Sequence, residues 1–155
     1  MTNLSVYLVE SADMYPDGPA LRCDGTTTSF SELADNAARF AAYLADRGLR
    51  PGDRVAVMLA NRPEFAMVFY GVLHAGAVVV PMDPLRSARE VEFFLTNTGA
   101  RLLVFAPSCA AAATADERRH GEGEHQAGCG DHRAAAGYCP DDPGVYPGVD
   151  LFFEP

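Results

Sequence analysis

The residues of this 155-residue chain with the clearest chemical potential are histidines and cysteines near its carboxyl end. They are His120, His125, Cys129, His132 and Cys139. Two residues separate Cys129 from His132, a spacing that can place two ligands on one zinc ion. The other spacings match no zinc finger, and aliphatic or aromatic packing residues are missing between them. We therefore favour incidental ligands in a tail over a zinc site, because short motif matches often mislead.

Four other residues are single candidates for chemistry. Arg62, beside a predicted helix start, could hold an anion, but an exposed arginine next to a helix cap is the commoner case. His74 lies near a predicted helix end, where it can face solvent, and has no Ser, Cys or Asp partner at a catalytic spacing. Cys23 and Cys109 resemble small apolar residues. The sequence therefore predicts no catalytic, cofactor-binding or metal-binding residue in this chain.

The chain has a net charge of −9, and all its positive charge comes from twelve arginines, without any lysine. Nucleic acids and anionic membranes reward clustered cations, so this balance argues against both as partners. The first residues include Glu10 and Asp13 and no basic leader, unlike a signal peptide. The longest apolar run, around Val72 to Val80, contains His74 and is shorter than the roughly 20 residues that span a bilayer. Four cysteines suit free thiols in a reducing cytoplasm, the predicted location.

Composition divides the chain near residue 115. Residues 1–115 carry twelve acidic residues against nine arginines and alternate apolar runs with turn signals. Residues 116–155 carry nine acids against three arginines, with seven glycines and four prolines. Only five of these forty residues are Val, Ile, Leu, Met or Phe, too few to offset the entropy cost of ordering the chain. We therefore expect a folded segment, 1–115, and a disordered tail, 116–155.

The folded segment opens with a predicted helix and a hairpin. The helix ends before Pro16, and its apolar stripe is predicted to be Leu4, Tyr7 and Leu8. Asp24-Gly25 then separates two short runs, Ala20–Cys23 and Thr26–Ser29. This dipeptide predicts a hairpin, because the tight turn needs positive φ at both central positions.

A longer helix is predicted after the hairpin. Ser29 and Glu32 form a capping-box signature at its start, and Gly48 is a typical residue just after a helix end. The spacing of its apolar residues predicts a buried stripe of Phe30, Leu33, Ala37, Phe40, Ala41 and Leu44.

Three apolar runs predict buried strands, and two helical patterns lie between them. The strands are Arg54–Leu59, Val78–Val80 and Arg101–Phe105. The first intervening helix is predicted to start at Asn61 with Pro63 in its first turn and to bury Phe65, Val68, Phe69, Val72 and Leu73. The second is predicted to start with the capping box Ser87 and Glu90 and to bury Val91, Phe94 and Leu95. This β-α-β-α-β order predicts an α/β fold, a partial Rossmann-like parallel sheet with flanking helices. A dinucleotide site is not expected, because residues 60–64 read Ala-Asn-Arg-Pro-Glu without a glycine.

Five motifs within residues 4–108 occur in the order and spacing of a known family. They read SFSEL, GLRPGDRV, NRPEF, AGAVVVP and ARLLV. Together they resemble the first segment of adenylate-forming (AMP-binding) acyl-CoA synthetases of the fatty-acid–CoA ligase type. The resemblance implies the N-terminal subdomain of the adenylate-forming fold. For the intact enzyme it implies ATP- and magnesium-dependent activation of a carboxylic acid to an acyl-adenylate, followed by transfer to coenzyme A.

The sequence departs from the family pattern after the third predicted strand. The family's phosphate-binding loop, rich in Ser, Thr and Gly and ending Pro-Lys-Gly, should follow, but residues 109–139 read CAAAATADERRHGEGEHQAGCGDHRAAAGYC. The Tyr-Gly-x-Thr-Glu motif, the ribose-binding Asp segment and the catalytic lysine are also missing. We therefore expect a truncated N-terminal part that is inactive alone, with no functional residue transferable from the family. The abrupt change toward Arg, Gly, His and Pro is what a frame shift in a GC-rich gene would produce.

An alternative function is a non-catalytic split subunit or binding module that docks with a second chain supplying the rest of the synthetase. Three strands alone would leave unpaired sheet edges and an apolar face. The isolated chain is therefore predicted to be marginally stable.

Overall fold

The computed structural model describes residues 3–109 and 150–153. The central feature is a sheet of four strands in the order β4-β3-β5-β6. β3 (Arg54–Met58) pairs in parallel with β4 (Val78–Pro81) on one side and with β5 (Leu102–Phe105) on the other. The predicted α/β fold with a three-stranded parallel sheet is therefore confirmed.

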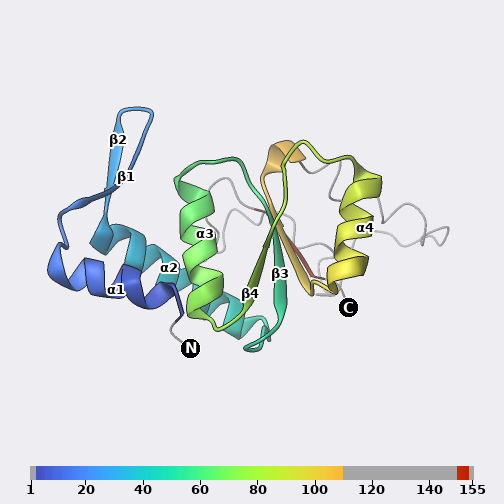
Figure 1. Cartoon of the computed structure of the whole chain (residues 1–155), viewed down its shortest axis with the longest axis horizontal. Helices are drawn as coiled ribbons and strands as arrows, with labels where there is room; N and C mark the ends of the chain where they lie inside the picture. Colours follow the sequence, from blue (N-terminus) through green and yellow to red (C-terminus); the bar gives the residue numbers. More distant parts are fainter. Residues whose placement is uncertain (1–2, 110–149, 154–155) are drawn as a thin grey trace, which may run out of the picture.

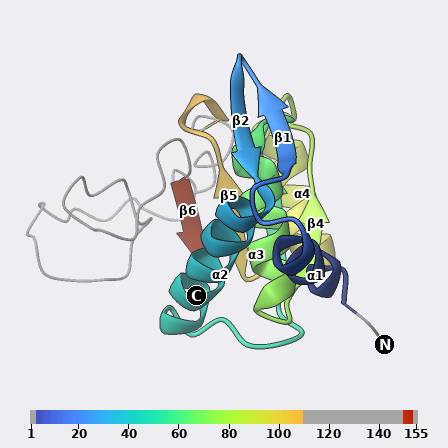
Figure 2. The ribbon, with the colours of Figure 1, turned by 90° about the vertical axis from the view of Figure 1, so that its left-hand side faces the viewer.

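The fourth strand, β6 (Asp150–Phe153), was not predicted from the sequence. It pairs antiparallel with β5 (Figure 2) and lies within the range expected to be a tail. The signal for it was the cluster of apolar residues that closes an otherwise polar stretch, Leu151, Phe152 and Phe153. The rest of the predicted tail, with all five zinc-ligand candidates, lies outside the described residues.

Helices cover both faces of the sheet (Figure 1). α1 (Ser5–Met14), α2 (Phe30–Asp46) and α3 (Pro63–His74) lie on one face, and α4 (Ala88–Thr98) lies on the other. Successive strand residues point to opposite layers. Val55 and Val57 of β3 join the core beneath α1, α2 and α3, while Ala56 and Met58 join the core beneath α4. β5 and the part of β3 that follows the exposed Arg54 are therefore apolar, because both of their faces are covered.

The predicted hairpin and the predicted capping boxes of α2 and α4 are confirmed. β1 (Pro19–Cys23) pairs antiparallel with β2 (Thr26–Ser29), and the turn residues Asp24 and Gly25 have φ of 49° and 78°. At the start of α2 the Ser29 N–H donates to the Glu32 carboxylate at 2.8 Å, and the Glu32 N–H donates to Ser29 Oγ at 3.2 Å. These reciprocal bonds satisfy two amides that a helix start would otherwise leave unpaired.

The stripes of α2 and α4 are buried as predicted except for Phe30 and Phe94, which are only partly buried. The other two predicted apolar stripes differ more from those observed. In α1, Leu8 is buried as expected, but Leu4 and Tyr7 are each 56% exposed and Ser5 is buried instead. In α3 the predicted Val68 and Val72 are buried, whereas Phe65, Phe69 and Leu73 are only partly covered. Their places in the core are taken by Met67 and Gly71, because α2 crosses α3 on that side.

Two further differences concern the ends of elements. The residue that caps α3 is Arg62 rather than Asn61, and its side chain makes no capping hydrogen bond. β4 is not a buried strand, because its first and last residues, Val78 and Pro81, are exposed. β4 pairs with β3 alone, so it forms an edge of the described sheet. Burial of a strand depends on this position in the sheet, which a short apolar run does not specify.

Candidate functional site at the carboxyl edge of the sheet

A ligand-binding site is expected at the carboxyl ends of the parallel strands. In doubly wound sheets, ligands bind there, where successive connections leave for opposite faces. Here the chain leaves β3 for α3 on one face and leaves β4 for α4 on the other. The loops after β3, β4 and β5, residues 59–62, 82–87 and 106–109, therefore frame the candidate site.

Arg62 in the first of these loops is held by carboxylates. Its Nη2 lies 3.1 Å from Asp24 Oδ2 in the hairpin turn, and its Nε lies 3.8 Å from Glu64 Oε2. The guanidinium thus ties the hairpin to the start of α3. This arrangement fits the structural interpretation of Arg62 better than the anion-binding one, because negative charge already surrounds it.

The second loop is organised by Glu90 in the first turn of α4. The Glu90 carboxylate accepts hydrogen bonds from the Ser87 N–H at 3.0 Å, from Arg86 at 2.7 Å and from Ser87 Oγ at 2.8 Å. The Ser87 backbone bond, with smaller contributions from Arg86 and the Ser87 hydroxyl, lowers the pKa of Glu90 to about 2. A carboxylate with this pKa remains ionised near neutral pH and is a poor proton donor or acceptor there.

The third loop contains Cys109, which is buried. Its Sγ lies 3.5 Å from the Pro84 carbonyl oxygen, so the thiol links the loops after β4 and β5. Cys23 is partly buried in the hairpin, and His74 is exposed at the end of α3. The predicted solvent-facing position of His74 is confirmed. These three candidates come from separate places in the fold, and the structure does not bring them together as a site.

Among residues 3–109 and 150–153, three or more His, Cys, Asp or Glu side chains nowhere gather in a way that could hold an ion. The predicted absence of catalytic, cofactor-binding and metal-binding residues remains a prediction for the whole chain.

A charged cluster that was not predicted lies at the opposite edge of the sheet. Asp53 Oδ2 accepts the Arg50 N–H at 2.8 Å and pairs with Arg101 Nη1 at 2.6 Å. The Arg50 hydrogen bond lowers the pKa of Asp53, partial desolvation opposes the shift, and Arg101 adds to it. The pair joins the starts of β3 and β5. Its partners are 48 residues apart, so no local sequence signal could reveal it.

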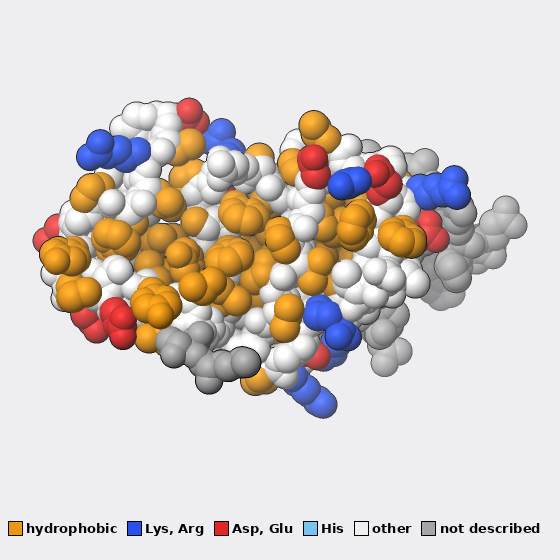
Figure 3. Space-filling view, in the orientation of Figure 1, with side chains coloured by type: hydrophobic (Ala, Val, Ile, Leu, Met, Phe, Trp, Pro, Cys, Tyr) orange, Lys and Arg blue, Asp and Glu red, His pale blue; other side chains and the backbone are white. Residues whose placement is uncertain are grey.

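The surface also presents exposed apolar side chains. Figure 3 shows them gathered over α1, α3 and β4. Among the residues that the structure describes, the large ones are Leu4, Val6, Tyr7, Val9, Met14, Tyr15, Val78, Leu85 and Phe93. Within the described residues, no helix combines the length and apolar character needed to cross a membrane.

The fold defines the chain as part of a doubly wound α/β domain. The family model described as AMP-binding enzyme matches residues 8–138. The chain belongs to this family, as its five motifs predicted. The match runs beyond residue 115, where the composition changes.

Curated relatives include several long-chain-fatty-acid–CoA ligases. The ligase of Bacillus subtilis (strain 168) is 38% identical over 101 residues, which cover 65% of this chain and 18% of that enzyme. The ligase of Yersinia pestis is 41% identical over 91 residues, which cover 58% of this chain and 16% of that enzyme. Surfactin synthase subunit 1 of Bacillus subtilis (strain 168) is 38% identical over 95 residues, covering 61% of this chain and 3% of that protein. The chain thus spans less than a fifth of the ligases it matches.

Solved structures show the same fold. The inhibitor-bound N-terminal domain of FACL13 from Mycobacterium tuberculosis superimposes with a TM-score of 0.71 at 29% identity, covering 79% of this chain and 31% of that one. A benzoate CoA ligase from Burkholderia xenovorans LB400 superimposes with a TM-score of 0.70 at 25% identity, and the match covers 74% of this chain and 23% of that one. These similarities confirm the predicted relation to the N-terminal part of adenylate-forming enzymes.

Proposed function

We propose that this chain forms the amino-terminal α/β segment of a fatty-acid–CoA ligase and does not catalyse the reaction alone. The observation that carries the proposal is the AMP-binding match over residues 8–138, together with ligase relatives more than five times as long as the matched segment. The parent reaction would use ATP and magnesium to convert a fatty acid into an acyl-adenylate and would then transfer the acyl group to coenzyme A.

The proposed inactivity of the isolated chain has a physical reason. Phosphoryl chemistry needs a cation and aligned backbone amides to stabilise the negative charge that develops on the leaving pyrophosphate. This chain has no lysine. In the loops that frame the carboxyl edge, Arg62 and Arg86 are engaged by Asp24 and Glu90. ATP, magnesium and coenzyme A would therefore be held by other parts of a complete enzyme.

The activity test uses the purified full chain with ATP, magnesium, a long-chain fatty acid and coenzyme A. We expect pyrophosphate and acyl-CoA to stay at the level of a reaction without protein. The Bacillus subtilis ligase in the same assay is the positive control. Pyrophosphate release that depends on both this chain and the fatty acid would contradict the proposal.

We also place the protein in the cytoplasm. The support is its four cysteines, which suit a reducing compartment, and its family. Fractionation of cells that express the full chain should recover it with a cytoplasmic marker enzyme. Recovery with the membrane fraction would argue against this location.

A second candidate function is a split subunit that docks with a chain supplying the rest of the synthetase. The observation that favours it is the set of exposed apolar side chains around α1 and β4. The test adds the full chain to a Bacillus subtilis ligase from which the matching first segment has been deleted. Recovery of acyl-CoA formation would support a subunit role, and its absence at saturating concentration would count against that role.

A further inference from the structure

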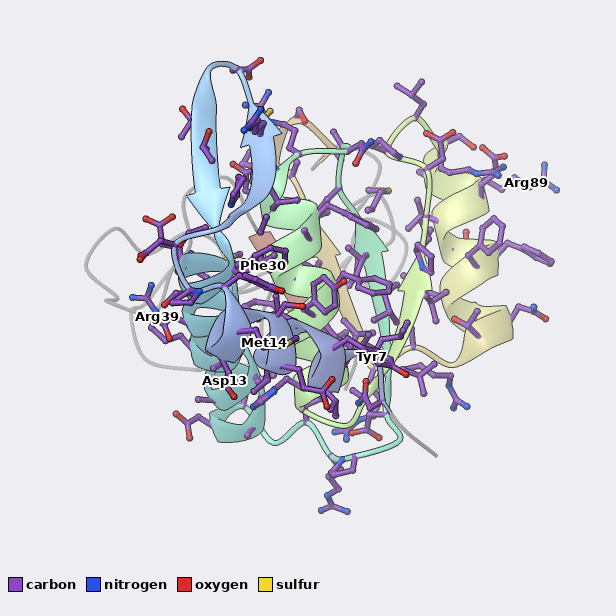
Figure 4. The ribbon with its side chains drawn as sticks, turned by 60° about the vertical axis from the view of Figure 1, so that its left-hand side comes forward. Tyr7, Asp13, Met14, Phe30, Arg39 and Arg89 are labelled. Carbon is purple, nitrogen blue, oxygen red and sulfur yellow. The ribbon has the colours of Figure 1, made fainter. Side chains whose placement is uncertain are left out.

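α1 is apolar on a side that nothing in the described structure covers. Leu4, Tyr7 and Met14 are 56%, 56% and 65% exposed. Their spacing of three and seven residues places them on one side of a helix, next to the side that buries Leu8. We name these three residues the outer stripe of α1. Figure 4 shows Tyr7 at the end of α1 nearer to β4 and Met14 toward the other end.

The outer stripe is held in a fixed place on the molecule. Asn3 Nδ2 donates to the Leu73 carbonyl oxygen at 2.5 Å, which fastens the start of α1 to the last turn of α3. α3 leads directly into β4, whose first residue, Val78, is 47% exposed. The stripe therefore adjoins the edge of the sheet, and Figure 3 shows apolar side chains across both. Exposed apolar side chains that adjoin one another can mark an interaction surface.

The β4 edge is poorly suited to pairing with a further strand. The Val78 N–H donates to the Asp53 carbonyl and the Met82 N–H to the Val57 carbonyl, each at 2.8 Å. Backbone groups of alternate residues face the two sides of a strand, so the open edge presents Val79 and Pro81. Proline has no N–H, and it commonly protects edge strands from pairing. A partner would therefore pack side chains on this side of the molecule rather than extend the sheet.

We propose that the outer stripe of α1 is the docking surface for the downstream part of an AMP-binding domain. The inference rests on the proposed function. It commits to this occupant because the chain covers only 31% of the matched FACL13 N-terminal domain and 18% of the Bacillus subtilis ligase. The proposed occupant is that remaining part of the domain. It would bind through apolar contacts that remove Leu4, Tyr7 and Met14 from water.

The test measures complex formation between the full chain and the Bacillus subtilis ligase lacking its matching segment, by sedimentation velocity. The disruptive variant is Tyr7→Ser with Met14→Ser. The control is Phe93→Ser, because Phe93 is 64% exposed on α4. Figure 4 shows α4, marked by Arg89, on the far side of the sheet from Tyr7. We expect one-to-one binding for the wild type and the control, and at least tenfold weaker binding for the double variant.

A second measurement uses the full chain alone. Because both substituted side chains are exposed, the double variant should keep the wild-type melting temperature and bind less of a hydrophobic dye. Equal complex formation by all variants, or no complex with the wild type, would overturn the proposal. Self-association abolished by the double variant would assign the stripe to a second copy and overturn it too. Complex formation without acyl-CoA turnover would support the docking surface while leaving the proposed ligase function unsupported.

Discussion

Gly71 shows how a single residue sets the distance between α2 and α3. A Cβ atom at this position would lie 2.8 Å from Phe40 Cδ1 and 2.9 Å from the Ala37 carbonyl oxygen. Both distances are shorter than real carbon contacts, and Phe40 is only 1% exposed, so its ring has little room to move. Gly71 is therefore required by packing, although glycine weakens a helix interior.

We predict that Gly71→Ala destabilises the protein by about 1–3 kcal/mol, the usual cost of overpacking a core. Helix propensity alone would give the opposite sign, a gain of about 1 kcal/mol. The measurement is chemical denaturation followed by circular dichroism. In a Phe40→Ala background the cost of Gly71→Ala should shrink, because one of the two clashing groups is gone. A stabilised Gly71→Ala variant would show that α2 and α3 separate without cost.

At the scale of elements, the start of α4 depends on an ionised Glu90. Its folded-state pKa of about 2 lies below the ordinary value of 4.5. A lowered carboxyl pKa contributes stability that is fully present above the unfolded-state pKa and is lost as pH falls through the folded-state value. We therefore predict that the melting temperature of the wild type falls more steeply between pH 4.5 and about 2 than that of Glu90→Gln.

Two further expectations serve as controls for this prediction. Asp53 also has a lowered pKa, so some pH dependence should remain in Glu90→Gln. Glu92→Gln, on the same helix but outside the capping box, should keep the wild-type pH profile. A carbon-detected NMR titration of Glu90 with a midpoint near the ordinary glutamate value would refute the role assigned to its hydrogen bonds.

Element types followed from local sequence because their causes are local. Asp24-Gly25 has the backbone freedom its turn demands, and Ser29 with Glu32 closes a cap within four residues. Exposure was predicted less well, because it depends on neighbours distant in sequence. Tyr7 and Leu8 both have helical spacing from Leu4, yet Tyr7 faces outward, since α2 and α3 cover only the side of Leu8 and Ser5. Val78 is as apolar as Val55, but only Val55 has strands on both sides.

The candidate site was predicted to the same limited extent. The order of motifs indicated the family, and His74 faces solvent as expected. The contacts of Arg62 with Asp24, and of Asp53 with Arg101, span 38 and 48 residues and follow only from the fold. The five tail ligands lie outside the described residues, so the zinc hypothesis remains a prediction that metal titration of the full chain can test.

At the scale of the whole molecule, β6 determines which strand forms the second edge of the described sheet: with β6 present the edges are β4 and β6, and without it the second edge would be β5. β5 is at most 5% exposed at each of its four residues, and β3 and β6 pair with its two sides. Without β6, the backbone of a fully apolar strand would face solvent. Unpaired strands of this kind are templates for association with other chains.

We predict that ending the chain at Val149, which removes β6, lowers the melting temperature and causes concentration-dependent association. The reason is that the outer N–H and C=O groups of Leu102–Phe105 lose their partners while the strand stays apolar. Sedimentation velocity over a hundredfold range of concentration measures the association. Ending the chain at Phe153 instead removes only Glu154 and Pro155 and should leave both properties unchanged. If the chain ending at Val149 is monomeric and melts like the wild type, β6 does not protect β5, and the outer stripe of α1 is the stronger source of any self-association.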